Sequence, residues 1–261
     1  MNDQSTYDDR FFDQREALVR ESARRIVPLV IELVSPASVI DVGCGDGVWL
    51  AVFQEQGVAD VAGIDGPWVS ADRLKIDPQR FESRDLNQPI EPRRQYDLAM
   101  SLEVAEHLAP AGAQQFIANL TALAPVVLFS AAVKLQGGTG HVNEQWQSYW
   151  ADRFGERDYV PVDCIRWRIW DDEAVAWWYR QNTLVYVRGD RLSDYPKLAA
   201  ERDLPVRFPL SIAHPERYEK AAAPRLANLD ALSLSDVLRI TPRLLKRAVV
   251  GRVARLFGKR P

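Results

Sequence analysis

The sequence predicts an α/β protein built on a largely parallel sheet. Short apolar runs of the buried-strand type alternate along the chain with stretches whose apolar residues have helical spacing. This alternation produces parallel pairing, because a crossover helix returns the chain to the sheet in the same direction. The length of 261 residues, with 47% hydrophobic and 26% charged side chains, suits one such domain with additions and excludes a disordered or fibrous chain.

The elements follow in order along the first half of the chain. Residues 10–34 have apolar positions at helical spacing, and Pro28 marks a kink or a break within that helix. The remaining expected elements are strands at 38–42, 58–64, 96–101 and 126–133, and helices at 48–53 and 110–123. Together they form the repeating strand–helix units of a parallel sheet.

The second half of the chain has a different texture. A glycine-rich loop at 136–141 precedes an aromatic-rich segment that holds six of the eight tryptophans. Extended segments at 159–170 and 183–187 flank a helical stretch at 171–181, which predicts an antiparallel hairpin at a sheet edge with a helix inserted. We therefore divide the chain into a helical cover (1–34), a central domain (35–189) and a helical appendage with a basic tail (190–261).

Composition also bounds the location and the partners. The two cysteines, Cys44 and Cys164, are not paired by their spacing, which favours a reducing compartment. The polar N-terminal residues do not resemble a signal peptide, and the longest apolar stretch, 122–133, is too short to span a bilayer. We expect a cytoplasmic protein. The net charge of −3 argues against nucleic acid as a partner.

The loop of residues 41–47, Asp-Val-Gly-Cys-Gly-Asp-Gly, lies between a predicted strand and a predicted helix. Its glycines allow a tight turn and let a ligand approach main-chain N–H groups. The G-x-G-x-G spacing differs from the dinucleotide pattern G-x-G-x-x-G, and no lysine follows as in a phosphate-binding loop. The loop is therefore a candidate ligand site of another class.

Two further acids stand at the ends of predicted strands. Asp65 lies 24 residues after Asp41, where a carboxylate accepts both ribose hydroxyls of an adenosine. The alternative for Asp65 is a simple turn, because Asp-Gly is a common turn pair. Asp85 stands where a third strand would end and suits the exocyclic amine of adenine, with a turn or pairing with Arg84 as the alternative.

These residues resemble the motifs of the class I S-adenosylmethionine-dependent methyltransferases. Residues 39–47 are similar to the first motif of that family, 63–65 to the second strand with its ribose-binding acid, and 96–108 to the fourth-strand motif. The resemblance covers roughly residues 35–135. It implies a Rossmann-like fold, with a seven-stranded, mostly parallel sheet, one antiparallel strand and helices on both faces. It also implies S-adenosyl-L-methionine as cofactor.

The residues expected to bind the cofactor come from the ends of the first, second, third and fourth strands. They are Asp41, Gly43, Cys44, Gly45, Asp65, Gly66, Asp85, Leu86, Ser101 and Glu103. We also expect the indole of Trp68 to cover the adenosine.

The acceptor follows from a finer resemblance. Residues 129–150 are similar to a bacterial subgroup linked with glycan or secondary-metabolite pathways, which favours a hydroxyl on a sugar, glycan or related small metabolite. One alternative is N- or C-methylation of an aromatic or lipid-soluble metabolite. Another is a non-catalytic cofactor-binding scaffold in glycan assembly, although retention of Asp41, Asp65 and Asp85 argues against it.

A hydroxyl acceptor needs a base, and the chain has three histidines. We favour His141, in the glycine-rich loop at the carboxyl edge of the sheet, although it could merely stabilise that loop. His107 is the second catalytic candidate, with a structural or cofactor-side role as its alternative, and His214 is expected in a surface turn. The scattered histidines and cysteines predict no metal site.

The residues that follow His141 are the substrate-binding candidates. They are Asn143, Glu144, Trp146, Tyr149 and Trp150. Polar side chains there could orient His141 or grip a polyhydroxylated acceptor, and aromatic rings stack on sugars. For Trp167, Trp170, Trp177 and Trp178 we favour a role in the core.

Residues 237–261 contain eight basic side chains and no acidic one. On a helix they would be amphipathic, so we predict peripheral contact of this tail with an anionic membrane surface, such as the inner face of a membrane, or with a lipid-linked substrate. The alternative is a solvated tail or a helix packed on the acidic body. The full chain should co-sediment with anionic but not neutral liposomes, in a salt-sensitive way, and truncation after Thr241 should abolish it. Equal recovery of both chains in the supernatant would refute the prediction.

Overall fold

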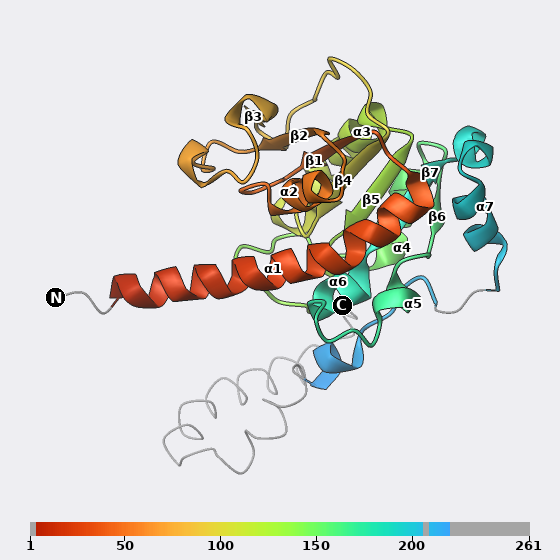
Figure 1. Ribbon diagram of the computed structural model, residues 1–261. Coiled ribbons are helices and arrows are strands. Elements are labelled where there is room, and N and C mark those ends of the chain that lie inside the picture. The colour runs from red at the N-terminus through yellow and green to blue at the C-terminus, as the bar shows by residue number, and fades with distance from the viewer. Residues whose placement is uncertain (1–3, 206–208, 220–261) are drawn as a thin grey trace, which may run out of the picture. The chain divides into compact units, whose positions relative to one another are not determined.

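The fold was analysed in a computed structural model, which describes residues 4–205 and 209–219 (Figure 1). The chain divides into two compact units, Met1–His214 and Pro215–Pro261. All the elements below belong to the first unit. The basic tail, 237–261, lies outside the described residues, so its membrane contact stays a prediction.

In the described part of the chain, seven strands form one sheet in the order β3-β2-β1-β4-β5-β7-β6. The first five pair in parallel, and β7 pairs antiparallel with both β5 and β6. The strands are β1 (Ser38–Val42), β2 (Asp60–Asp65), β3 (Phe81–Ser83), β4 (Leu98–Leu102), β5 (Val126–Ser130), β6 (Tyr159–Val162) and β7 (Leu184–Arg188). The expected Rossmann-like sheet with one antiparallel strand is confirmed.

Helices cover both faces of the sheet (Figure 1). Successive residues of a strand point to opposite faces, so both faces carry apolar side chains that need cover. Leu98 and Met100 of β4 pack into one apolar cluster, and Ala99 packs into the other. The first cluster includes residues of α1 (Gln4–Val34), α2 (Val48–Glu55), α5 (Arg166–Ile169), α6 (Trp177–Asn182) and α7 (Pro196–Asp203). The second includes residues of α3 (Ala113–Leu123) and α4 (Gln147–Gly155).

Short 3₁₀ turns connect several of these elements. They are η1 (Ala71–Arg73), η2 (Pro78–Arg80), η3 (Ala105–His107), η4 (Pro110–Gly112) and η5 (Gly189–Asp194). Of these, η3 matters most for function, because it follows β4 at the carboxyl edge of the sheet. In the described part of the chain, no helix is long and apolar enough to cross a membrane.

Helix α1 continues through Pro28, so the break that the sequence left open does not occur there, and the kink stays a prediction. Proline removes one main-chain hydrogen bond from a helix interior. The residues around Pro28 offset this cost by packing, since Ile26, Val27 and Val30 are completely buried in the core. The apolar face of the helix therefore decides its length.

The predicted hairpin at the sheet edge is confirmed, and its inserted helix is shorter than expected. Strands β6 and β7 pair antiparallel, with α5 and α6 between them. The acidic segment before α6 forms a turn, because the Asp172 side chain accepts a hydrogen bond of 3.1 Å from the Ala174 amide. Helix α6 consequently begins at Trp177 rather than at residue 171.

Two parts of the C-terminal region belong to the first unit. Leu198 of α7 is completely buried in the core cluster that contains α1. His214, expected on the surface, is only 6% exposed. Its ring nitrogen Nε2 lies 3.0 Å from the Trp170 carbonyl, and its amide donates to the Gln181 side chain at 2.8 Å. The surface expectation for His214 was wrong, because its surroundings come from distant segments.

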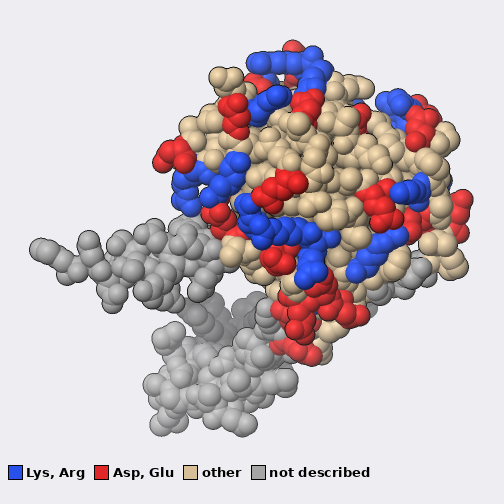
Figure 2. All heavy atoms as spheres, in the orientation of Figure 1, with Lys and Arg blue, Asp and Glu red and all other residues tan. Residues whose placement is uncertain are grey.

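Acidic and basic side chains are interspersed over the described part of the face in Figure 2. Such mixing gives this face no extended field of a single sign.

Asn119 on α3 anchors the chain after β3. Its Oδ1 accepts a hydrogen bond of 3.0 Å from the buried Ile90 amide, and its Nδ2 donates to the Gln88 carbonyl at 2.9 Å. We expect Asn119→Ala to lower the free energy of unfolding in urea by about 1–3 kcal/mol, because a buried amide loses its partner. Gln114→Ala, an exposed change on the same helix, should stay within about 0.5 kcal/mol of wild type. Equal stability of both variants would contradict this account.

Candidate active site

The candidate site lies at the carboxyl edge of the parallel strands. Strand β1 is flanked by β2 on one side and β4 on the other, so the strand order reverses there. In open α/β sheets, ligands bind in the crevice that such a reversal leaves between the following loops. The loops after β1, β2, β4 and β5 therefore supply the residues considered below.

The glycine loop after β1 is shaped by close packing. Gly43 has a φ of +90°, and a Cβ atom there would lie 2.4 Å from the Val104 side chain, so both its conformation and its space require glycine. The amides of Gly43 and Cys44 donate to the Ile64 carbonyl at 2.7 and 3.2 Å. The Gly45 amide donates to Asp65 at 2.7 Å. These amides are thus bonded within the protein, and the loop offers shape rather than free N–H groups.

Two buried carboxylates meet beside this loop. Asp41 and Asp65 are 2% and 6% exposed. Oδ1 of Asp41 is buried without a hydrogen-bond partner among the described residues. Burial, and then repulsion from Asp65, raises the pKa of Asp41 well above its usual range. The pair suits a ligand that brings a cationic group to Asp41 and hydroxyl groups to Asp65, as the amino acid and ribose parts of S-adenosylmethionine would.

The remaining residues expected at the adenosine end have varied environments. The exposed indole of Trp68 packs over Gly66, where a Cβ atom would lie 2.1 Å from the ring. Asp85 is exposed and accepts hydrogen bonds from the amide and side chain of Asn87 at 3.0 and 2.9 Å. The Leu86 side chain is buried in the core. Asp85 therefore caps the turn after β3.

Ser101 and Glu103 lie at the end of β4. The buried Ser101 hydroxyl donates to the Val42 carbonyl at 2.7 Å and joins β4 to β1. Glu103 has a φ of +57°, and its carboxylate accepts hydrogen bonds from Gln136 at 2.9 Å and Asn182 at 3.0 Å. Glu103 lines a pocket together with Glu106, His107 and His141. Its position favours the acceptor side over the cofactor side expected from the sequence.

That pocket has a cavity volume of about 640 Å³, within the range of small-molecule sites. Trp177, Trp178 and Tyr179 of α6 form an aromatic wall, and α1 adds an apolar rim. The other lining residues are Leu18, Val19, Leu102, Glu103, Glu106, His107, Gln136, Gly137, Gly138, Thr139 and His141. The pocket borders the glycine loop, because Val104, between the lining residues Glu103 and Glu106, contacts Gly43.

The two favoured histidines meet on the pocket floor. The rings of His107 and His141 are 4.9 Å apart, edge to face. Nε2 of His141 lies 4.0 Å from the Oε1 atom of Glu106, and Glu106 is completely buried. Burial, and then the neighbouring Glu103 carboxylate, raises the pKa of Glu106 well above its usual range. Glu106 is not recognisable as a site residue from its local sequence, because its position beside His141 depends on a loop more than 30 residues away.

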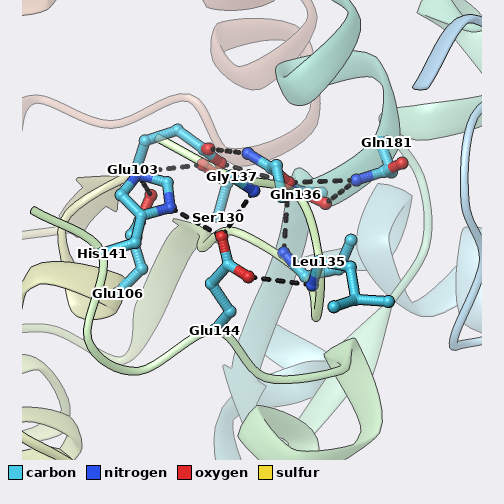
Figure 3. Close-up of polar contacts among 11 residues, drawn as sticks. Glu103, Glu106, Ser130, Leu135, Gln136, Gly137, His141, Glu144 and Gln181 are labelled. Carbon is cyan, nitrogen blue, oxygen red and sulfur yellow. Dashed lines mark hydrogen bonds and ion pairs between the residues drawn. The ribbon is translucent and has the colours of Figure 1, made fainter. Parts of the chain in front are cut away.

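Glu144 holds His141 and the glycine-rich loop in place (Figure 3). Its carboxylate accepts hydrogen bonds from the amides of Leu135 at 2.8 Å and Gly137 at 2.6 Å. The same carboxylate lies 3.0 Å from Nδ1 of His141. Both oxygens are therefore engaged by the protein, which favours an orienting role for Glu144 over direct contact with the acceptor.

The other substrate-binding candidates lie outside the lining of this pocket. Trp150 is 1% exposed and packs on Phe129 in the core, so its expected role against the acceptor must be corrected. Asn143 is buried, Trp146 is partly exposed, and the Tyr149 ring lies under the Arg153 guanidinium. The aromatic wall comes from Trp177 and Trp178, both predicted as core residues, and Trp178 also packs partly against the core.

A family model described as a methyltransferase domain matches residues 12–184, which is more than half of the chain. The chain belongs to this methyltransferase family. Together with the ordered motifs around Asp41, Asp65 and Glu103, this identifies an S-adenosylmethionine-dependent methyltransferase, and thus an enzyme rather than a non-catalytic scaffold. The buried, unpartnered oxygen of Asp41 and the Asp65 carboxylate fit the cofactor.

Solved structures share the fold. Magnesium protoporphyrin IX methyltransferase from Synechocystis PCC 6803 is 19% identical, with a TM-score of 0.51, over 68% of this methyltransferase and 87% of that chain. The methyltransferase domain of bacterial CtHen1 is 21% identical, with a TM-score of 0.46, over 64% and 97%. At 19% identity, the likeness to the first of these structures concerns the fold alone. A search of curated proteins finds no match.

We expect binding of S-adenosylhomocysteine to release protons. The free Asp41 carboxyl holds its proton to unusually high pH, because burial and Asp65 raise its pKa, and a ligand ammonium would lower that pKa again. Affinity should therefore rise as pH increases through the raised pKa of Asp41 and fall below it. Calorimetry in buffers of different ionisation enthalpy measures the protons released.

Asp41→Asn should weaken this binding by about 10- to 100-fold, since a charge-assisted hydrogen bond contributes about 1.5–3 kcal/mol. It should also remove most of the proton release. Asp190→Asn, which removes an exposed charge paired with Arg188, is the matched control and should change neither quantity. Undiminished proton release in Asp41→Asn would count against this assignment.

Proposed function

We propose that this methyltransferase methylates a hydroxyl group on a sugar, glycan or related ring-containing small metabolite. The observation that carries the proposal is the composition of the pocket next to the glycine loop. An aromatic wall faces a floor formed by Glu106, His107 and His141. A ring with an attached hydroxyl suits both surfaces at once.

The aromatic wall supports binding of a ring-shaped acceptor. The indoles of Trp177 and Trp178 lie edge to face at 5.7 Å and both line the cavity. Aromatic faces pack against the C–H faces of sugars and against flat metabolites, while polar groups at one end fix orientation. Gln136 and Thr139 provide such polar groups in the same lining.

The floor supports removal of the hydroxyl proton. When bound, S-adenosylmethionine supplies a methyl group on a positively charged sulfur. The glycine loop after β1 borders the pocket floor, where the acceptor hydroxyl would meet that methyl group. Glu144 directs Nδ1 of His141 away from the cavity, so Nε2 faces Glu106 and the pocket. In this arrangement Nε2 is the atom that receives the proton of the acceptor hydroxyl.

N-methylation is the competing reaction that one observation favours. Two carboxylates, those of Glu103 and Glu106, line the pocket, and an amine acceptor would be attracted to them as its ammonium form. The ammonium must then lose its proton before it can attack, which the same carboxylates would oppose. This balance favours the hydroxyl, and a panel that contains both acceptor classes compares them directly.

The test is methyl transfer to a panel of sugars, phenols and amines. We expect S-adenosylhomocysteine to form with hydroxylated ring compounds, and mass spectrometry and NMR should locate the new methyl group on oxygen. His141→Ala should lower kcat by about 10²- to 10⁴-fold, the range for loss of a proton-transfer group, with little effect on cofactor affinity. Trp178→Ala should mainly raise the KM for the acceptor.

The assignment has clear points of failure. Transfer to amines but not to hydroxyls would move the proposal to N-methylation. Full activity of His141→Ala on a hydroxyl acceptor would remove His141 from the chemistry. Tyr149→Ala is the control for the aromatic wall, because Tyr149 lies outside the pocket lining and should leave KM unchanged.

A further inference from the structure

Glu106, His107 and His141 bring one carboxylate and two imidazoles to the same point of the pocket. One ligand atom from each of the three lies within 4.8 Å of the others. Glu106 and His107 belong to η3, whereas His141 comes from the loop after β5. We propose that these three side chains bind a divalent transition-metal ion.

The charge around this point favours a cation. Glu106 is completely buried, and neither of its carboxylate oxygens has a hydrogen-bond partner among the described residues. Glu103 contributes a second carboxylate to the same pocket, and among the residues whose side chains are described its lining contains no lysine or arginine. A buried charge is costly unless it is paired or coordinates a metal. The pocket thus brings two carboxyl groups close together with little solvent, and a divalent cation bound there would stabilise the charged form of both.

The orientation of His141 supports metal binding independently. A carboxylate accepts hydrogen bonds, so the contact of 3.0 Å between Glu144 and Nδ1 places the ring proton on Nδ1. The lone pair of Nε2 then faces the Glu106 oxygen, 4.0 Å away. In a tetrahedral site, two bonds of about 2.0–2.2 Å place their ligand atoms about 3.3–3.6 Å apart, so a small approach of the His141 and Glu106 side chains would let one ion bind both.

Glu144 also matches the usual surroundings of a metal-binding histidine. Such histidines almost always donate their second ring N–H to a carboxylate, a carbonyl or water, which orients the ring. The Glu144 carboxylate is itself held by the amides of Leu135 and Gly137 (Figure 3). The main-chain carbonyl of Glu106 accepts hydrogen bonds from Val142 and Asn143 at 2.9 and 3.0 Å, which ties the two ligand segments together.

The set of donor atoms indicates which metals would bind. Imidazole nitrogens favour Zn²⁺, Fe²⁺, Co²⁺ and Mn²⁺ over Mg²⁺ and Ca²⁺, which prefer oxygen ligands. Three protein ligands leave coordination positions open toward the cavity, as in catalytic rather than structural sites. The expected order of affinity therefore places Zn²⁺ and Mn²⁺ well ahead of Mg²⁺.

The role of the ion rests on the proposed function. A divalent cation lowers the pKa of a hydroxyl that binds to it, so the ion would orient the acceptor and promote loss of its proton to water. His141 would then act as a ligand of the ion, because one Nε2 lone pair cannot hold both a metal and a proton. Binding of the ion itself requires no acceptor and can be measured without methyl transfer.

The test uses the full, untagged chain after treatment with EDTA. Titration with Mn²⁺, followed by the loss of the free-ion EPR signal, should show one saturable site, and Zn²⁺ should compete for it. Glu106→Gln and His141→Gln should each weaken Mn²⁺ affinity by at least tenfold, and Glu144→Gln by about 10- to 100-fold. Glu156→Gln, an exposed change on the surface, should leave the affinity unchanged.

Circular dichroism and S-adenosylhomocysteine binding show whether each variant is folded. The proposal is overturned if the wild-type chain binds neither Mn²⁺ nor Zn²⁺ saturably, or if folded Glu106→Gln and His141→Gln bind Mn²⁺ as wild type does. Methyl transfer to hydroxyls by a chain that binds neither Mn²⁺ nor Zn²⁺ would leave the proposed function standing and refute the metal site, whereas transfer by the metal-free form of a chain that does bind them would refute only the ion's role in the reaction. Metal binding without transfer to any hydroxyl would support the metal site and refute the proposed function.

Discussion

Burial of carboxylates without compensating positive charge is the constraint on which this site depends. Asp41 beside the glycine loop and Glu106 on the pocket floor are both nearly inaccessible to water, and burial raises the pKa of each. Each position costs stability, because the charged form has lost its hydration. The rest of the fold offsets this cost, and the residues are poised for ligands that bring positive charge.

The fold was predictable from the sequence because its signals are local. Apolar runs and glycine positions are read within a few residues, and the segments around Asp41, Asp65 and Glu103 lie at the ends of neighbouring strands. Their order along the chain was therefore enough to place them at one sheet edge. The antiparallel hairpin of β6 and β7 was also predictable, whereas the start of α6 depended on a side-chain turn at Asp172.

The pocket was much less predictable because its walls come from distant segments. Whether a tryptophan enters the core or the cavity depends on the angle at which its helix meets the sheet. Trp150 of α4 packs on Phe129, whereas Trp178 of α6 lines the cavity. The three proposed metal ligands were not predictable for the same reason, because spacing rules find ligands that are close in sequence and not a histidine that another loop brings to the site.

The turn after β4 contacts both the glycine loop and the pocket. Glu103 adopts a left-handed backbone conformation, which costs a non-glycine residue about 1–3 kcal/mol and persists only where the surroundings enforce it. Here its amide donates to the Ser130 carbonyl at 3.0 Å, and Asn182 and Gln136 hold its carboxylate. Because the chain reverses at this residue, Val104 can pack on the glycine loop while Glu106 reaches His141. The same turn thus contributes both to the packing of the glycine loop and to the lining of the pocket that contains Glu106.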